Sequence, residues 1–112
     1  MVNINYVPDR GDIIWIEFNP QAGHEQAGRR PALVISPKSY NKITGLCVLF
    51  PITNQIKGYP FEVEIPKSKI TGVILCDHIK NLDWKARNAE FAAKAPKNIV
   101  EEVINLFSTL IS

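Results

Sequence analysis

Two short polar segments hold most of the side chains in this sequence that could do chemistry. The first, residues 23–31 (GHEQAGRRP), brings an imidazole, a carboxylate, an amide and two guanidinium groups together between two apolar stretches. Its two glycines let the backbone bend sharply or approach a ligand closely. Flanking strands would give the polar groups a rigid base, as in many binding and catalytic sites. An exposed loop with a surface ion pair would have the same composition, so composition alone leaves both interpretations open.

The second polar segment, residues 53–59 (TNQIKGY), directly follows an apolar stretch that ends at Ile52. It offers a hydroxyl, two amides, an ammonium and an aromatic ring, which suit phosphate oxygens and unstacked bases. An ordinary turn between two strands is the alternative interpretation. If the two segments lie at the same edge of a sheet, they form one polar cleft that also carries an aromatic ring.

A third candidate is the sequence Cys76-Asp77-His78, in which two polar side chains end an apolar stretch. Asp77 has two possible roles. It is either a second carboxylate of the site or an ion-pair partner for Arg30 or Arg87, and the sequence does not separate these roles.

The rest of the sequence argues against several other chemistries. The two histidines lie 54 positions apart and no Cys or His pair has the spacing of metal ligands, so we expect no bound metal. The sequence has no phosphate-binding or dinucleotide-binding glycine motif and no Gly-x-Ser-x-Gly nucleophile motif, so we expect no cofactor. A phosphodiesterase built from these residues would work by acid–base and electrostatic catalysis.

RNA makes such catalysis feasible because its 2′-hydroxyl is a built-in nucleophile. The enzyme then has to deprotonate this hydroxyl, stabilise the crowded phosphate and help the 5′ oxygen to leave. Glu25 suits the role of base, and Arg30 suits the phosphate because its planar fork matches two oxygens. Since a guanidinium effectively never releases its proton, His24 is chemically the better general acid than Arg30, but both assignments stay open.

The elements that must position these groups are a series of short strands followed by one helix. Pro31–Ser36 and Leu46–Thr53 have the continuous apolar character of buried strands, and residues 61–65 alternate as in a half-exposed strand. Further strands are expected at residues 11–18 and 72–79, a helical turn within 37–45, an ambiguous stretch at 80–94, and a helix from Pro96 to Ile111. The pattern predicts a single α+β domain over residues 1–112, with a strongly curved sheet or small barrel and the helix packed on it.

Composition and cysteine usage point to an ordinary folded protein in a reducing compartment. The chain has 13 basic and 11 acidic side chains, a net charge of +2, and this small excess is weak evidence for an anionic partner. Cys47 and Cys76 each lie in an apolar stretch, which favours buried free thiols over a disulfide. No apolar stretch approaches the roughly 20 residues that span a bilayer, and the first residues do not have the pattern of a signal peptide. We therefore expect a cytoplasmic protein with no membrane contact.

Several segments together resemble the MazF/PemK endoribonuclease toxins. The similarity runs from about Tyr6 to the terminal helix and is carried by VPDRGDIIW (7–15), GHEQAGRRPA (23–32), PIT (51–53), KGYPFEV (57–63) and WKAR (84–87). The resemblance implies a twisted antiparallel sheet in an SH3-like, partly closed barrel, a smaller sheet and a C-terminal helix. It also implies a homodimer, single-stranded RNA as substrate, cut at specific sequences without a metal, and a MazE-like antitoxin whose disordered tail wraps the toxin.

The resemblance also assigns roles to individual residues. It places the catalytic groups at Glu25, Arg30 and Thr53, and it aligns His24 and Asp77 with residues of PemK-like members. Those members carry an arginine two positions before the aspartate, where this chain has Leu75. Asp77 is therefore expected to contact substrate rather than to act in catalysis. The expected RNA-binding residues are His24, Arg29, Asn54, Gln55, Lys57 and Asp77.

Two other functions remain as alternatives. The first is a non-enzymatic toxin of the same fold that poisons a gyrase subunit, but such relatives do not have the loop with Glu25 and Arg30. The second is a plain single-strand RNA-binding module without catalytic activity. Cleavage of RNA in the presence of excess chelator would separate the enzyme from both.

Overall fold

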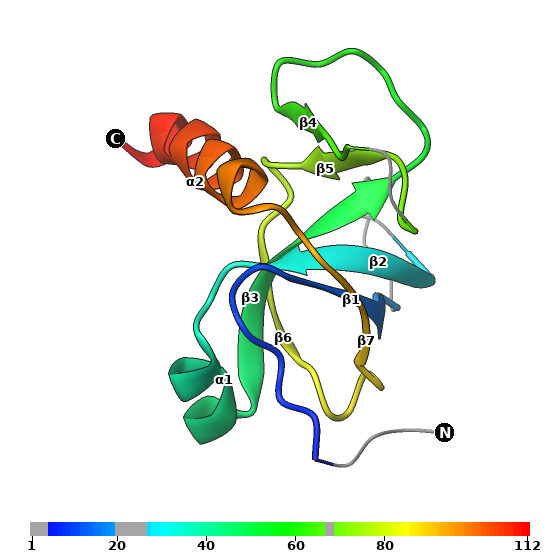
Figure 1. Ribbon diagram of the computed structural model, residues 1–112, viewed down its shortest axis with the longest axis vertical. Coiled ribbons are helices and arrows are strands. Elements are labelled where there is room, and N and C mark those ends of the chain that lie inside the picture. The colour runs from blue at the N-terminus through cyan, green and yellow to red at the C-terminus, as the bar shows by residue number, and fades with distance from the viewer. Residues whose placement is uncertain (1–4, 20–26, 67–68) are drawn as a thin grey trace.

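The computed structural model describes residues 5–19, 27–66 and 69–112 of the chain (Figure 1). Within these residues the order of elements is β1 (Asp12–Glu17), β2 (Arg29–Val34), α1 (Lys38–Thr44), β3 (Leu46–Thr53), β4 (Glu62–Glu64), β5 (Val73–Leu75), β6 (Lys80–Asp83), β7 (Glu90–Lys94) and α2 (Lys97–Ile111). The expected α+β class, with a C-terminal helix after the strands, is confirmed.

All strand pairs in the described residues are antiparallel, and they form a seven-stranded sheet that does not close. The order is β4-β5-β3-β2-β1-β7, and β6 pairs with β3 beside this path. Leu49 of β3 is in register with Val34 of β2 and also with Lys80 of β6, so β2 and β6 lie on opposite edges of β3. Further along β3, Ile52 is in register with Ile74 of β5. The long strand β3 therefore joins the larger part of the sheet to the small part formed with β4 and β5 (Figure 1).

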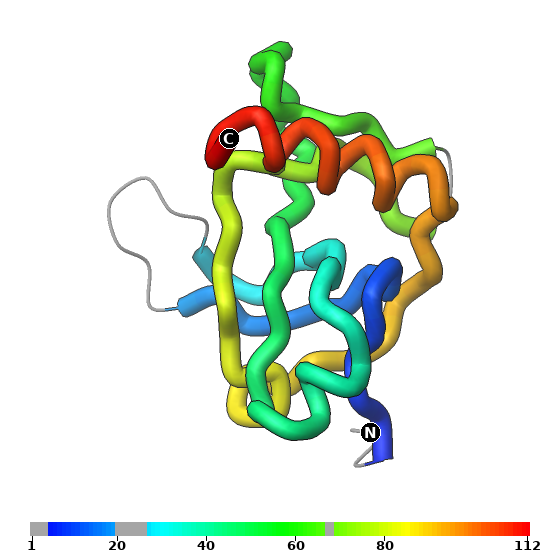
Figure 2. Tube along the Cα trace, turned by 90° about the vertical axis from the view of Figure 1, so that its left-hand side faces the viewer, coloured from blue at the N-terminus to red at the C-terminus, as the bar shows by residue number. Residues whose placement is uncertain are grey.

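Two hydrophobic clusters hold the sheet in place, one on each face of β1. Ile14 and Ile16 belong to one cluster and Ile13 to the other, as expected for a strand whose side chains alternate between two covered faces. Helix α2 covers the cluster that contains Ile13. Its apolar residues form a stripe at helical spacing, and Val103 in this stripe is fully buried. The ring of Phe107 in α2 lies 5.4 Å from the ring of Phe50 in β3, and the helix lies across one end of the molecule beside β4 and β5 (Figure 2).

The structure corrects several of the expected boundaries. The fifth strand ends at Leu75 instead of residue 79, because the chain turns there and the His78 N–H donates to the Leu75 carbonyl at 3.1 Å. The ambiguous stretch at 80–94 contains two strands, β6 and β7, joined by a turn in which Asn88 has a φ of 55°. A complete short helix, α1, forms where only a helical turn was expected. Strand β2 begins at Arg29, two residues before the expected start.

Cys47 and Cys76 are both free and buried, as the sequence predicted. Burial raises the pKa of each thiol to about 12, so both stay protonated and unreactive near neutral pH. Within the described part of the chain, no helix is long and apolar enough to cross a membrane.

Candidate active site

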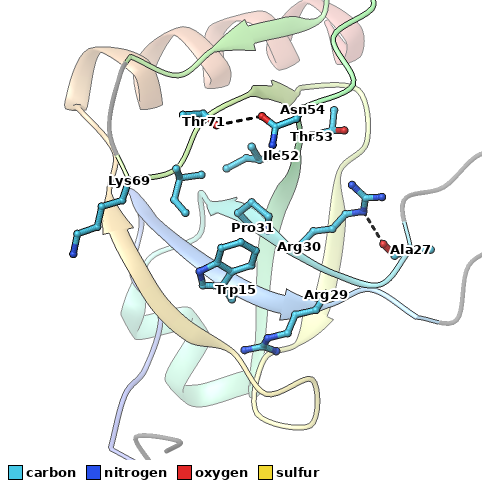
Figure 3. A pocket seen from close by; sticks show the side chains of 11 residues that line it. Trp15, Ala27, Arg29, Arg30, Pro31, Ile52, Thr53, Asn54, Lys69 and Thr71 are labelled. Atoms are coloured by element: carbon cyan, nitrogen blue, oxygen red, sulfur yellow. Dashed lines mark hydrogen bonds between the residues drawn. The ribbon is translucent and has the colours of Figure 1, made fainter.

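A pocket of about 430 Å³ lies where β2 begins and β3 ends (Figure 3). The two strands run antiparallel, with Ala32 in register with Pro51, so the first residues of β2 and the last residues of β3 meet at the same end of the strand pair. This register brings Arg29 and Arg30 of the first polar segment close to Thr53 and Asn54 of the second. The lining residues are Trp15, Ala27, Arg29, Arg30, Pro31, Ile52, Thr53, Asn54, Lys69, Ile70 and Thr71.

Arg30 is held in this pocket through one edge of its guanidinium. Its Nε donates to the Ala27 carbonyl at 2.6 Å, and this bond is drawn in Figure 3. The terminal nitrogens of a guanidinium carry further N–H donors in a planar fork that fits two oxygens of a carboxylate or a phosphate. The bond to Ala27 therefore fixes the direction of the side chain while it leaves the fork as a separate set of donors.

Thr53 is almost buried at the end of β3, with 5% of its surface exposed. Its hydroxyl oxygen accepts a hydrogen bond from the Gln55 N–H at 3.1 Å. Because the oxygen already serves as an acceptor for the turn, the hydroxyl proton is the part of this group suited to an incoming oxygen atom. Thr53 thus offers a donor whose position is fixed by the local turn.

Thr71 and Gly72, just before β5, pack against the end of β3. The Thr71 hydroxyl donates to Oδ1 of Asn54 at 3.3 Å. Gly72 has a φ of 121°, and a Cβ at this position would stand 2.4 Å from the carbonyl oxygen of Thr53. Only glycine fits here, because both the backbone conformation and the close approach exclude a side chain.

Arg29 lies at the margin of the pocket and forms an ion pair with Glu90 of β7. Both side chains are partly exposed, so the pair is weak in free energy and an anion in the pocket can compete for the guanidinium. The pair nevertheless keeps Arg29 close to the pocket.

A second pocket of about 300 Å³ shares Thr53 with the first. Its lining residues are Thr53, Gln55, Lys57, Tyr59, Phe61, Glu62, Leu75, Asp77 and His78. The Glu62 carboxylate accepts hydrogen bonds from the backbone N–H groups of Lys57 and Gly58, at 3.1 and 2.9 Å. These bonds order the segment, and the ammonium of Lys57 lies 5.8 Å from the ring centroid of Tyr59. The polar segment at residues 53–59 is therefore ordered by these contacts and lines one side of the second pocket.

Asp77 lies in the second pocket, where one carboxylate oxygen is 3.8 Å from His78 Nε2. Arg87, one of the two expected ion-pair partners, instead donates to the carbonyl oxygens of Glu17 and Asn19 at 3.0 and 2.9 Å. The position of Asp77 thus agrees better with a pocket residue than with a salt bridge to Arg87.

The structure gathers most of the site residues expected from the sequence around Thr53. Arg29, Arg30 and Asn54 line the first pocket with it, and Gln55, Lys57 and Asp77 line the second. His24 and Glu25 lie outside the described residues. Four further lining residues, Trp15, Glu62, Lys69 and Thr71, were not predicted from the sequence, whereas His78 had been named only as part of the third candidate. The described residues contain no group of three or more His, Cys, Asp or Glu side chains that could hold a metal ion.

Comparison with known proteins identifies the family. Residues 9–111 match the model of the PemK-like, MazF-like toxins of type II toxin–antitoxin systems. The chain belongs to this family. The endoribonuclease toxin MazF of Escherichia coli is 54% identical over 84 residues, which are 75% of this chain and 76% of that protein. The resemblance drawn from the sequence motifs is therefore confirmed.

Solved structures of the MazF/PemK family agree with this fold. A crystal structure of MazF from Deinococcus radiodurans has a TM-score of 0.93 and 51% sequence identity, and covers 96% of this chain and 98% of that one. A MazE–MazF complex from the same organism has a TM-score of 0.86 at 44% identity, with the same coverage of the two chains. The seven-stranded sheet with its C-terminal helix is thus the MazF architecture.

Proposed function

We propose that this chain is an endoribonuclease toxin that cleaves single-stranded RNA at specific sequences and thereby stops translation and growth. One observation carries the proposal: the pairing of β2 with β3 places Arg30 and Thr53 in one pocket of a MazF/PemK-family chain. The relatives named as endoribonucleases MazF and PemK support the same activity.

The proposed reaction uses the 2′-hydroxyl of the RNA as nucleophile. Glu25 takes the hydroxyl proton while the 2′ oxygen bonds to phosphorus, and Arg30 and Thr53 donate to the phosphate oxygens as their negative charge grows. The bond to the 5′ oxygen then breaks, and His24 or Arg30 supplies the proton that this oxygen needs. The products are a 2′,3′-cyclic phosphate and a 5′-hydroxyl. The parts of Glu25 and His24 rest on the sequence alone.

The remaining site residues would bind the RNA on either side of the scissile phosphate. Arg29 and Asn54 lie in the pocket with Arg30, whereas Gln55, Lys57 and Asp77 lie in the second pocket. Since the pockets share Thr53, a single strand can pass from one to the other across the reacting phosphate. Contacts to bases in the second pocket would give the enzyme its sequence preference.

A deoxy-substituted substrate tests this mechanism. The purified protein should cleave a defined RNA in excess EDTA, because a carboxylate, a guanidinium and a hydroxyl suffice for acid–base and electrostatic catalysis. The same oligonucleotide with 2′-deoxyribose at the scissile nucleotide should resist cleavage and still bind. Mass spectrometry of the all-RNA products should show a cyclic phosphate. Efficient cleavage of the deoxy substrate would rule out the 2′-hydroxyl mechanism, and binding without any cleavage of RNA would favour a non-enzymatic module.

We also propose that the toxin is a cytoplasmic homodimer that a MazE-like antitoxin inhibits. The MazE–MazF complexes among the similar structures support such a partner. A disordered acidic segment of the antitoxin would bind the basic groove near Arg29, Arg30 and Lys57, helped by charge attraction.

Light scattering should therefore show a dimer at micromolar concentration, and an antitoxin peptide should compete with RNA. Its association rate should fall steeply with salt, because charge attraction speeds the encounter. A fully active monomer, or a peptide that binds together with RNA, would contradict this assembly.

A further inference from the structure

The first pocket has an apolar floor that neighbouring strands build together. Trp15 of β1 is in register with Pro31 of β2, and directly paired residues point to the same face of an antiparallel sheet. Ile52 of β3 also lines the pocket. Figure 3 shows Trp15 next to Pro31 in the middle of the pocket, with Lys69 and Arg29 at its margins.

Trp15 is unusually exposed for its place in the sheet. Ile13, two residues earlier on the same face of β1, is only 1% exposed, whereas 38% of the surface of Trp15 is exposed. Indole is the largest flat apolar side chain available to a protein, and leaving it open to water forgoes hydrophobic stabilisation. The ring is therefore placed to receive a second flat apolar surface in the pocket.

The charges around this floor indicate what that second surface belongs to. Arg29, Arg30 and Lys69 line the pocket, and among its described lining residues there is no Asp or Glu. A ligand that fits must combine negative charge with flat rings, which is the combination that single-stranded nucleic acid presents. An apolar protein segment would offer no negative charge to Arg30 and Lys69, and Arg29 would keep only its partly exposed ion pair with Glu90.

We propose that Trp15 is a stacking platform for one base of the substrate RNA, with Arg29 and Lys69 binding the phosphates beside that base. The proposal rests on the proposed function, since it places this base next to the scissile phosphate at Arg30 and Thr53. The second pocket shares Thr53 with the first, so under this proposal the two pockets hold nucleotides on either side of the cleavage point. Stacking tolerates all four bases, which makes this the less selective side.

Binding of the uncleavable deoxy-substituted oligonucleotide tests the platform directly. Trp15→Ala should weaken binding by about ten- to a hundredfold at fixed salt, because stacking of one base on an aromatic ring contributes that much affinity. Trp15→Phe should lose much less, since it keeps a ring. The matched control is Phe91→Ala, which removes another exposed aromatic ring, one that lies against Tyr6 and lines neither pocket. It should bind RNA as the wild type does.

Fluorescence and abasic nucleotides show whether the contact is with a base. RNA should quench the emission of the wild type but not of Trp15→Phe, because the other tryptophan, Trp84, is bonded through Nε1 to the Asn41 carbonyl and packs in a separate cluster. Removing one base at a time should reveal one position whose loss weakens wild-type binding and does not weaken Trp15→Ala further.

The outcomes separate this proposal from the proposed function. A wild type that neither binds nor cleaves RNA would overturn both. If the wild type cleaves RNA while Trp15→Ala binds equally well, or stays sensitive to every abasic position, the platform is wrong and the endoribonuclease stands. If Trp15→Ala binds RNA as tightly as the wild type but has a different oligomeric state, Trp15 serves self-association, and this result would also overturn the platform.

Discussion

Arg30→Ala is expected to lower kcat for RNA cleavage by about 100- to 1,000-fold, the usual effect of removing one donor that stabilises charge in a transition state. The Nε–H bond to Ala27 holds the guanidinium in the pocket that also contains Thr53, so its fork can bind the phosphate as charge develops. Arg30→Lys should recover only part of the rate, because an ammonium keeps the charge and lacks the two-pronged geometry. Single-turnover cleavage of a defined RNA measures both variants.

Arg10 provides a matched control for this experiment. Its Nε also donates to a backbone carbonyl at 2.6 Å, that of Ile35, but the side chain lies outside both pockets. Arg10→Ala therefore removes the same kind of bond without removing a cation from the site, and cleavage should continue at the wild-type rate. Thermal melting of all three variants checks the fold. Near-wild-type cleavage by Arg30→Ala would remove this residue from the proposed mechanism.

The elements predicted best from the sequence are those with a strong apolar pattern of their own, either a continuous apolar run or an apolar stripe at helical spacing. Strand β3 was expected at Leu46–Thr53 and is found there, because its continuous apolar run leaves no other way to bury it. Helix α2 carries its own periodic stripe and was found within a residue of its expected start. Strands β6 and β7 were missed because their sequences, KNLD and EFAAK, are short and partly polar. They become strands through pairing with β3 and β1, which no local pattern encodes.

The candidate site was predictable where residues with suitable chemistry lie at the ends of strands that pair with each other. Arg30 is the second residue of β2 and Thr53 is the last residue of β3, and the antiparallel pairing of these two strands brings the start of one next to the end of the other. Trp15 could have been found only from the register that places it beside Pro31. Lys69 comes from a loop before β5 and had no signal at all, since its position depends on how the small part of the sheet folds back over β3.

Gly72 shows the same dependence on long-range structure, and its role in the site follows from two separate constraints. Its positive φ disfavours any side chain, and a Cβ would meet the Thr53 carbonyl oxygen at 2.4 Å. Gly45 shares only the first constraint: its φ is 74°, and nothing lies within 4 Å of the place where its Cβ would stand. The two glycines therefore separate the cost of an unfavourable backbone conformation from the cost of displacing Thr53.

We expect Gly72→Ala to lower both the free energy of unfolding, by about 2–4 kcal/mol, and kcat, by about 100-fold. The new methyl group must push Thr53 and the end of β3 aside. Even a small displacement of the Thr53 hydroxyl then misaligns this donor with the phosphate. Gly45→Ala should lose only about 1–2 kcal/mol from its left-handed backbone and should cleave RNA at the wild-type rate. Urea denaturation gives the stabilities, and cleavage is measured at a temperature where both variants are fully folded. If folded Gly72→Ala cleaves RNA as fast as Gly45→Ala, the position of Thr53 does not limit the reaction, and its assignment as a catalytic donor is wrong.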